Sequence, residues 1–76
     1  MKKKIAILGS TGSIGKTSLE IFQKDLKRFQ IILLLANSNY SLIKKQIKQY
    51  KPKFFVINNY AVYRKIKKQY KKNTIK

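Results

Sequence analysis

The chain has 76 residues, enough for one small domain, and its 19 lysines and arginines against two carboxylates give a net charge of +17. It has no cysteine and no histidine, which excludes disulfides, thiolate metal sites and histidine-based catalytic triads. The carboxylates, Glu20 and Asp25, lie on one predicted helix, so unless a lysine acts as the base we expect the chain to bind a ligand and not to transform it.

The first predicted element is a short strand at residues 5–8. It is apolar at every position, and we therefore expect it to be buried on both faces of a parallel sheet. A loop over residues 9–13 follows. A helix is then predicted over residues 14–26, because apolar residues recur there at helical spacing along one face. These residues are Ile14, Leu19, Phe22 and Leu26.

A second apolar strand is predicted at residues 31–36, followed by the polar turn Asn37-Ser38-Asn39. The next helix begins after this turn, with Ser41 or Asn39 as its cap, and ends at Pro52. Its inward face is expected to carry Leu42, Ile43, Ile47 and Tyr50.

The third predicted strand covers residues 54–57, which are again apolar throughout. Asn58 and Asn59 turn the chain into a last helix and can cap it. Its apolar face is expected to consist of Val62, Ile66 and Tyr70. The polar end, residues 71–76, is expected to fray.

The resulting order is β-α-β-α-β-α, which indicates an α/β fold with a parallel sheet and right-handed crossovers. This is half of a Rossmann-like doubly wound sheet, which has three layers when complete. We expect residues 1–76 to be the first half of a nucleotide-binding domain. The first strand should lie at the inner edge, with an open ladder where a fourth strand would pair.

The stretch from Gly9 to Gly15 contains all three glycines of the chain, and it resembles two kinds of phosphate-binding loop. A P-loop needs G-x-x-x-x-G-K-S/T. Gly15-Lys16-Thr17 matches its end, but the position five residues before Gly15 is Ser10 and not glycine. Lys16 is therefore better interpreted as a solvated helix residue.

The second candidate is a dinucleotide-binding turn with the spacing Gly9-x-x-Gly12-x-x-Gly15. In this interpretation Gly9 makes the turn out of the strand, Gly12 leaves space for the pyrophosphate, and Gly15 lets the helix pack close to the strand. The hydroxyls of Thr11 and Ser13 add donors. The unpaired N–H groups at the helix start attract phosphate in either candidate.

The end of the second strand favours NADP(H) over NAD. An NAD site places a carboxylate there to bind the ribose 2′-hydroxyl. Here the segment is Ala36-Asn37-Ser38-Asn39, and no carboxylate follows Asp25 in the chain. Amide and hydroxyl donors without a negative charge are compatible with a 2′-phosphate.

The N-terminal sequence KKIAILGSTGSIG resembles that of the 1-deoxy-D-xylulose 5-phosphate reductoisomerase family, whose loop residues 9–15 match throughout. The resemblance continues over most of the chain and leaves only the last dozen residues uninformative. Further residues that fall where the family has similar ones are Phe29, the apolar strand to Ala36, Asn39, Gln46, Tyr50 and Pro52-Lys53.

This resemblance implies an NADPH-dependent oxidoreductase of non-mevalonate isoprenoid biosynthesis. We expect a cytoplasmic location, because the N-terminal residues do not form a signal or transit peptide. Such enzymes rearrange 1-deoxy-D-xylulose 5-phosphate, reduce it to 2-C-methyl-D-erythritol 4-phosphate, need Mg or Mn, and are homodimers. The resemblance implies that their catalytic, metal-binding and C-terminal parts lie downstream of residues 1–76. The chain is accordingly expected to be inactive alone, as a truncated reading frame, a sequencing fragment or a split gene product.

The family's cofactor contacts carry over to two segments of this chain. The first consists of Thr11, Gly12, Ser13 and Ile14, and the second of Asn37, Ser38 and Asn39. Two positions depart from many relatives: Asn37 stands where glycine is common, and Ser38 stands where a basic residue often meets the 2′-phosphate. The serine can donate a hydrogen bond but supplies no charge.

Two alternatives to a reductoisomerase segment stay open at this point. One is a P-loop hydrolase fragment. The other is a small basic nucleic-acid-binding protein, which the net charge and three tyrosines among the lysines would suit: Tyr60, Tyr63 and Tyr70. However, lysine outnumbers arginine by 17 to 2, which favours codon bias over selected phosphate recognition. We therefore expect no nucleic-acid partner.

No membrane partner is expected either. The apolar run at residues 5–8 stops at Gly9, which is short of the ~7–15 apolar residues of a signal peptide. The run at residues 29–36 is also shorter than the ~20 residues that span a bilayer.

Overall fold

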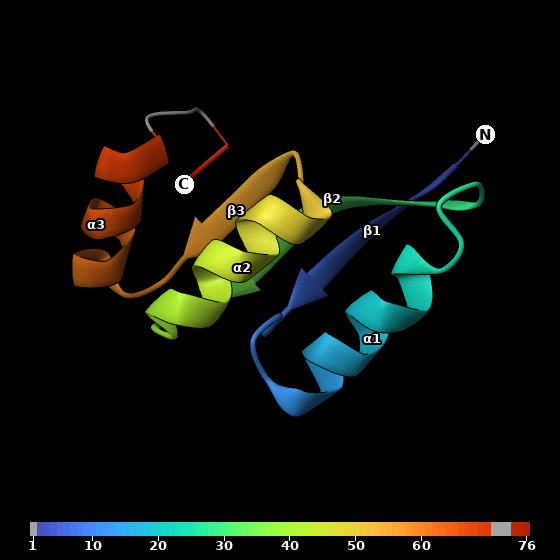
Figure 1. Ribbon diagram of the computed structural model, residues 1–76, viewed down its shortest axis with the longest axis horizontal. Coiled ribbons are helices and arrows are strands. Elements are labelled where there is room, and N and C mark those ends of the chain that lie inside the picture. The colour runs from blue at the N-terminus through green and yellow to red at the C-terminus, as the bar shows by residue number, and fades with distance from the viewer. Residues whose placement is uncertain (1, 71–73) are drawn as a thin grey trace.

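The structure, a computed structural model, describes residues 2–70 and 74–76, and its strands and helices alternate along the chain (Figure 1). The elements are β1 Lys3–Leu8, α1 Ser13–Gln23, β2 Phe29–Ala36, α2 Tyr40–Tyr50, β3 Phe54–Ile57 and α3 Tyr60–Tyr70. The predicted order is confirmed, and β3 has the predicted bounds. No helix within the described residues has the length and apolarity that crossing a membrane would require.

Asparagine side chains cap the N-termini of two of the three helices. The Asn39 Oδ1 accepts a hydrogen bond from the Leu42 N–H at 3.2 Å, and the Asn59 Oδ1 accepts one from the Val62 N–H at 3.1 Å. Each side chain thereby satisfies an amide that the first helical turn leaves unpaired. Of the two caps considered for α2, the structure uses Asn39.

Helix α1 ends at Gln23, before the predicted end at Leu26, because the chain turns sharply after it. The Asp25 carbonyl accepts from the N–H groups of both Arg28 and Phe29 at 3.1 Å. This turn brings the ring of Phe29 onto that of Phe22, edge to face, with centroids 5.0 Å apart. The ring contact replaces the last predicted turn of the helix and leaves Leu26 half exposed.

The three strands form one parallel sheet in the order β1-β2-β3. Ile7 pairs with Leu34, and Leu34 pairs with Phe55, so these three side chains form one row across the sheet. All three are buried. The parallel sheet predicted from the alternating pattern is therefore confirmed.

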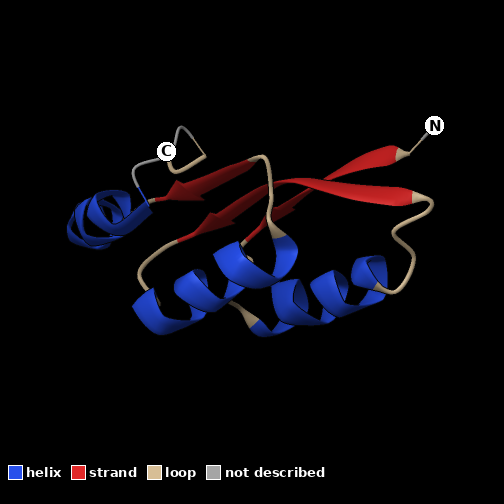
Figure 2. Ribbon diagram, turned by 45° about the horizontal axis from the view of Figure 1, so that its top comes forward, coloured by secondary structure: helices blue, strands red, loops and turns tan. Residues whose placement is uncertain are grey.

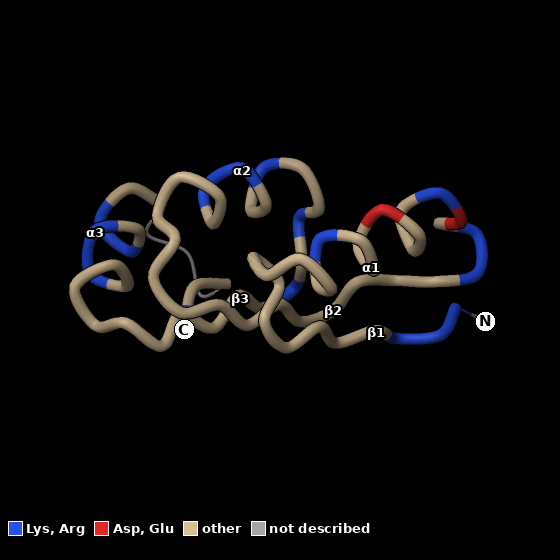
Figure 3. The backbone as a smooth tube through the Cα atoms, turned by 90° about the horizontal axis from the view of Figure 1, so that it is seen from below, with Lys and Arg blue, Asp and Glu red and all other residues tan. Residues whose placement is uncertain are grey.

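All three helices lie on the same side of the sheet (Figure 3), and Figure 2 shows α1 and α2 next to each other beneath the strands. Right-handed crossovers that keep moving in one direction along a parallel sheet put every helix on one face. The core lies between these two layers. Its fully buried side chains are Leu19, Leu34, Ile43, Phe55 and Ile66.

The prediction that the first strand is buried on both faces is wrong. Ile7 points to the helices and is 7% exposed, whereas its neighbour Leu8 is 73% exposed. Ala6 is exposed as well. Among the described residues, nothing pairs with the outer edge of β1 and nothing covers the second face of the sheet there. The open edge expected for this strand is present.

The prediction that the end of the chain frays is wrong for residues 74–76, and its residues 71–73 lie outside the described residues. Ile75 forms a parallel bridge with Phe55 and is only 1% exposed. The Phe55 N–H donates to the Thr74 carbonyl at 2.8 Å, and the Lys76 N–H donates to the Phe55 carbonyl at 2.9 Å. One isoleucine in a polar tail thus reaches the core by pairing with the free edge of β3.

Candidate functional site

The glycine loop leaves the carboxyl end of β1 and is tied to the neighbouring strand. The N–H groups of Gly9 and Ser10 both donate to the Leu35 carbonyl of β2, at 2.8 and 2.9 Å. Gly9 has a φ of +79°, a conformation that glycine adopts without strain. The Gly12 N–H donates back to the Gly9 carbonyl at 3.0 Å, which closes the turn in front of α1.

Gly15 lets α1 approach this turn at backbone distance. A Cβ at Gly15 would lie 2.2 Å from the Gly9 carbonyl oxygen and 2.9 Å from the Ser10 Cα. Real Cβ atoms do not come so close to backbone atoms, so no other residue fits at this position. The close helix–strand packing predicted for Gly15 is confirmed, and so is the turn predicted at Gly9.

Gly12 differs from Gly15 in having open space around it. A Cβ there would meet one atom, the Gly9 carbonyl oxygen, at an ordinary contact distance of 3.4 Å. Gly12 is exposed and has extended backbone angles at the start of α1. The fold itself therefore tolerates a side chain at this position, and such a side chain would extend into open space beside the loop.

Among the three helices of the described residues, α1 alone starts without a side-chain cap. Gly12 occupies the cap position, and no acidic residue follows in the first turn. Asn39 and Asn59 seal the other two helix starts. The first-turn amides of α1 and the positive end of its dipole are thus available to an anion.

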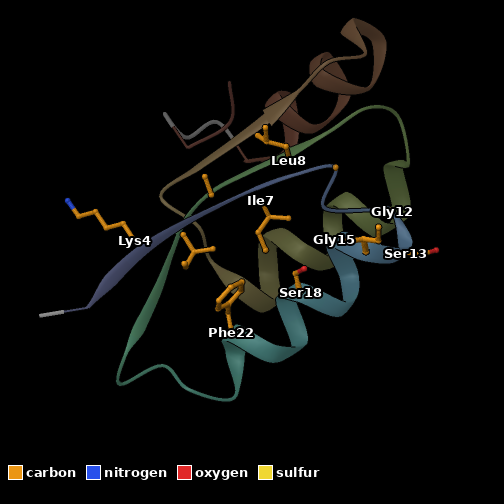
Figure 4. A pocket seen from close by; sticks show the side chains of 12 residues that line it. Lys4, Ile7, Leu8, Gly12, Ser13, Gly15, Ser18 and Phe22 are labelled. Carbon is orange, nitrogen blue, oxygen red and sulfur yellow. The ribbon is translucent and has the colours of Figure 1, made fainter.

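An open cleft of about 860 Å³ runs along β1, the glycine loop and the first turns of α1. Figure 4 shows Gly12 and Gly15 together at one end of the cleft, with Ile7 and Phe22 deeper along it and Lys4 at the far end. Ser13 and Ile14 stand at the loop end, where Ile14 is 84% exposed. Of the first predicted contact set, Gly12, Ser13 and Ile14 line this cleft.

The second predicted contact set, Asn37, Ser38 and Asn39, lies at the carboxyl end of β2 and is exposed. The glycine loop bonds to the Leu35 carbonyl near the end of the same strand. Both sets therefore lie at one edge of the sheet, where doubly wound folds bind their ligands. The Asn37 carbonyl accepts from the Asn59 N–H at 3.1 Å, which ties this segment to the loop after β3.

Two side chains near the loop bear on the P-loop alternative. The Thr17 hydroxyl donates to the Ser13 carbonyl of its own helix at 3.0 Å. Lys16 is exposed on the surface of α1. Neither side chain is held toward the loop, which agrees with the interpretation of Lys16 as a solvated helix residue. Within residues 2–70 and 74–76, no cluster of three or more metal-ligating side chains occurs.

Sequence reasoning missed the role of one residue, Gln46 of α2. Its Nε2 donates to the Ser10 carbonyl at 2.7 Å, and the side chain is 3% exposed. The available signal was its position: Gln46 follows the buried Ile43 by three residues, so it lies on the inward face of α2. A polar side chain on an inward face needs a buried partner.

A family model described as 1-deoxy-D-xylulose 5-phosphate reductoisomerase matches residues 5–76 of the chain. The enzyme of this description from Porphyromonas gingivalis is 49% identical over 59 residues, which are 78% of this chain and 15% of the relative. The one from Elusimicrobium minutum is 40% identical over 72 residues, which are 95% of this chain and 18% of the relative.

A solved structure, 1-deoxy-D-xylulose 5-phosphate reductoisomerase from Zymomonas mobilis in complex with NADPH, has the same fold with a TM-score of 0.81. It is 32% identical, and the match covers 90% of this chain and 18% of that chain. The chain thus spans 15 to 18% of the length of these proteins.

Proposed function

The chain belongs to the 1-deoxy-D-xylulose 5-phosphate reductoisomerase family, whose model matches residues 5–76, and we propose that it binds NADPH at the glycine loop. The observation that carries this proposal is the uncapped start of α1 beside the close-packed turn between Gly9 and Gly15. The Zymomonas mobilis relative of the same fold is a complex with NADPH.

The pyrophosphate of NADPH would lie against the first-turn amides of α1. Gly12 leaves room for it because it has no Cβ, and the hydroxyls of Thr11 and Ser13 can donate to its oxygens. Ile14 presents an apolar surface at the same end of the cleft. When bound, NADPH supplies the hydride, and the role of this chain is to hold and orient the nucleotide.

The 2′-phosphate of the adenosine would lie at Asn37, Ser38 and Asn39. These residues offer amide and hydroxyl donors, and the segment has no carboxylate that would repel the phosphate. The Asn39 Oδ1 is engaged in capping α2, so the donor that this residue offers is its side-chain N–H group. Ser38 contributes a hydroxyl where the resemblance leads us to expect a basic side chain.

The wider activity is proposed for the enzyme as a whole. It is an NADPH-dependent oxidoreductase that converts 1-deoxy-D-xylulose 5-phosphate into 2-C-methyl-D-erythritol 4-phosphate. The sugar-phosphate substrate, the Mg or Mn ion and the homodimer contacts belong, in this proposal, to the parts of the relatives that the chain does not span. We propose that residues 1–76 are the first half of the NADP-binding domain, whose second half pairs with the open edge of β1.

Selective binding of NADPH is the first expected result. We expect amide signals of residues 9–15 and 37–39 to shift in a ¹⁵N NMR titration with NADPH, because both segments face the nucleotide. NADH, which lacks the 2′-phosphate, should bind about tenfold more weakly and should leave the Ser38 amide unmoved. About 0.3 M salt in all titrations screens the net charge. Stronger binding of ATP than of NADPH at the loop would contradict the proposal.

A second expected result separates the dinucleotide loop from a P-loop. Replacing Lys16 with alanine should change NADPH affinity by less than about twofold, because the side chain is exposed on α1 and is not part of the proposed binding site. A P-loop lysine binds the outer phosphates directly, so its loss would abolish nucleotide binding. The same titration checks this, and a large loss of affinity in Lys16→Ala would revive the P-loop alternative.

A further inference from the structure

The structure joins the glycine loop to α2 by one buried hydrogen bond between residues 36 positions apart in the sequence. We propose that Gln46, which donates this bond to the Ser10 carbonyl, is a positioning residue that keeps the loop in its nucleotide-binding conformation. The inference rests on the proposed function, because it names the residue that sets the loop for its ligand.

The bond fixes one peptide group of the loop. Gln46 is 3% exposed and Ser10 is 0% exposed, and the Nε2 lies 2.7 Å from the Ser10 carbonyl oxygen. The described residues contain no cis peptide bond, and in a planar trans peptide the N–H points away from the preceding C=O. Because Gln46 holds the Ser10 carbonyl toward α2, the Thr11 N–H is turned away from α2.

The other contacts of the loop do not set this peptide. The N–H groups of Gly9 and Ser10 bond to the Leu35 carbonyl of β2, and the Gly12 N–H bonds to the Gly9 carbonyl. These bonds hold the entry and the exit of the turn. Among the described contacts, the bond from Gln46 alone holds the Ser10 carbonyl. If the Ser10–Thr11 peptide rotated, a carbonyl oxygen would face outward in place of the Thr11 N–H.

The choice of glutamine has a cost that an apolar side chain would avoid. The Gln46 Oε1 and the Ser10 Oγ are both buried without a hydrogen-bond partner, and an unpaired buried polar atom is unfavourable. A leucine would remove the unpaired Gln46 oxygen, but it would also leave the buried Ser10 carbonyl without this donor. The amide therefore fixes the orientation of the Ser10–Thr11 peptide at the cost of one unpaired side-chain oxygen.

The test uses the same substitution at two glutamines of α2. Gln46→Leu removes the donor to Ser10. Gln49→Leu is the control, because Gln49 is exposed and has no bond to the glycine loop. Its Nε2 donates a hydrogen bond to the Gln23 Oε1 of α1 at 3.3 Å. Gln46→Met, which is flexible and similar in volume, is included as a second variant that lacks the donor.

We expect Gln46→Leu to stay folded, with a lower unfolding midpoint because the buried Ser10 carbonyl loses its donor, and to weaken NADPH binding about tenfold or more at a temperature where the variant is folded. Without ligand, its Thr11 amide should change in chemical shift and exchange faster with solvent. Gln49→Leu should keep both the affinity and the Thr11 signal. Parent affinity in folded Gln46→Leu or Gln46→Met would overturn the proposal, and so would unfolding of both variants while Gln49→Leu folds.

The proposed NADPH binding and the positioning role of Gln46 can fail independently. If the parent chain binds no NADPH but Gln46→Leu alone alters the Thr11 amide, the proposed function fails and the positioning of the loop by Gln46 stands. If the parent binds NADPH and the Thr11 amide and the affinity are unaffected by Gln46→Leu, the positioning role fails and the proposed function stands.

Discussion

Replacing Gly15 with alanine should lower the free energy of unfolding by about 3 kcal/mol, which is a large part of the total unfolding free energy of a chain of this size. The new Cβ would lie 2.2 Å from the Gly9 carbonyl oxygen, 2.9 Å from the Ser10 Cα and 3.0 Å from the Gly9 carbonyl carbon. These are backbone atoms of a turn that is bonded to β2, so they cannot move aside cheaply. Urea unfolding followed by circular dichroism measures the loss.

Gly12→Ala is the matched control for this substitution. Its Cβ would meet the Gly9 carbonyl oxygen at 3.4 Å and nothing else within 4 Å, so the expected loss of stability is at most about 1 kcal/mol. The variant should nevertheless fail to bind NADPH, because the methyl group fills the space proposed for the pyrophosphate. Equal stability of Gly15→Ala and the parent would contradict the close approach of α1 to the loop.

Replacing Ile75 with alanine should cost about 2–4 kcal/mol of unfolding free energy, although Ile75 is the second residue from the end of the chain. Its side chain is 1% exposed and belongs to the core formed by the helices and the sheet. The substitution leaves a cavity beside β3 and weakens the bridge between Ile75 and Phe55. Thermal or urea unfolding measures the effect.

Ile21→Ala serves as the control, since Ile21 carries the same side chain on α1 but is 60% exposed. Its expected cost is below about 0.5 kcal/mol. If the two alanine variants were equally stable, the end of the chain would be frayed as the polar composition of residues 71–76 predicts, and the pairing of residues 74–76 with β3 would be wrong.

The alternation of strands and helices was predictable because each element carries its own signal. The third strand is bounded by Pro52 on one side and by Asn58 and Asn59 on the other, and its predicted bounds are those of β3. Asn39 and Asn59 cap helices because a side-chain oxygen two or three residues before an unpaired amide can reach it. Signals that act within one turn of the chain are readable from the sequence.

Features that depend on a distant partner were not predictable in the same way. An apolar strand is buried on both faces only if something covers both, and Leu8 is exposed because nothing in the described residues does so. The polar tail pairs with β3 because that edge is free and Ile75 fits the core. Neither the uncovered face at Leu8 nor the free edge of β3 can be inferred from the residues next to them in the sequence.

The candidate site shows the same division. The spacing of Gly9, Gly12 and Gly15 predicted a turn and a close helix, and the structure has both. The bond from Gln46 to Ser10 was not predictable, since its acceptor is a main-chain carbonyl that any residue could provide. The net charge does not single out the candidate site: Lys and Arg occur on all three helices and at the start of β1 (Figure 3).

The central claim is that the Thr11 amide and the first-turn amides of α1 bind the pyrophosphate of NADPH. A crystal structure of the chain with NADPH tests it most directly. The expected result places the pyrophosphate oxygens within hydrogen-bonding distance of these amides and the 2′-phosphate beside Ser38 and Asn39. A nucleotide bound elsewhere, or phosphates reached by the Lys16 ammonium group while the first-turn amides stay free, would contradict the account.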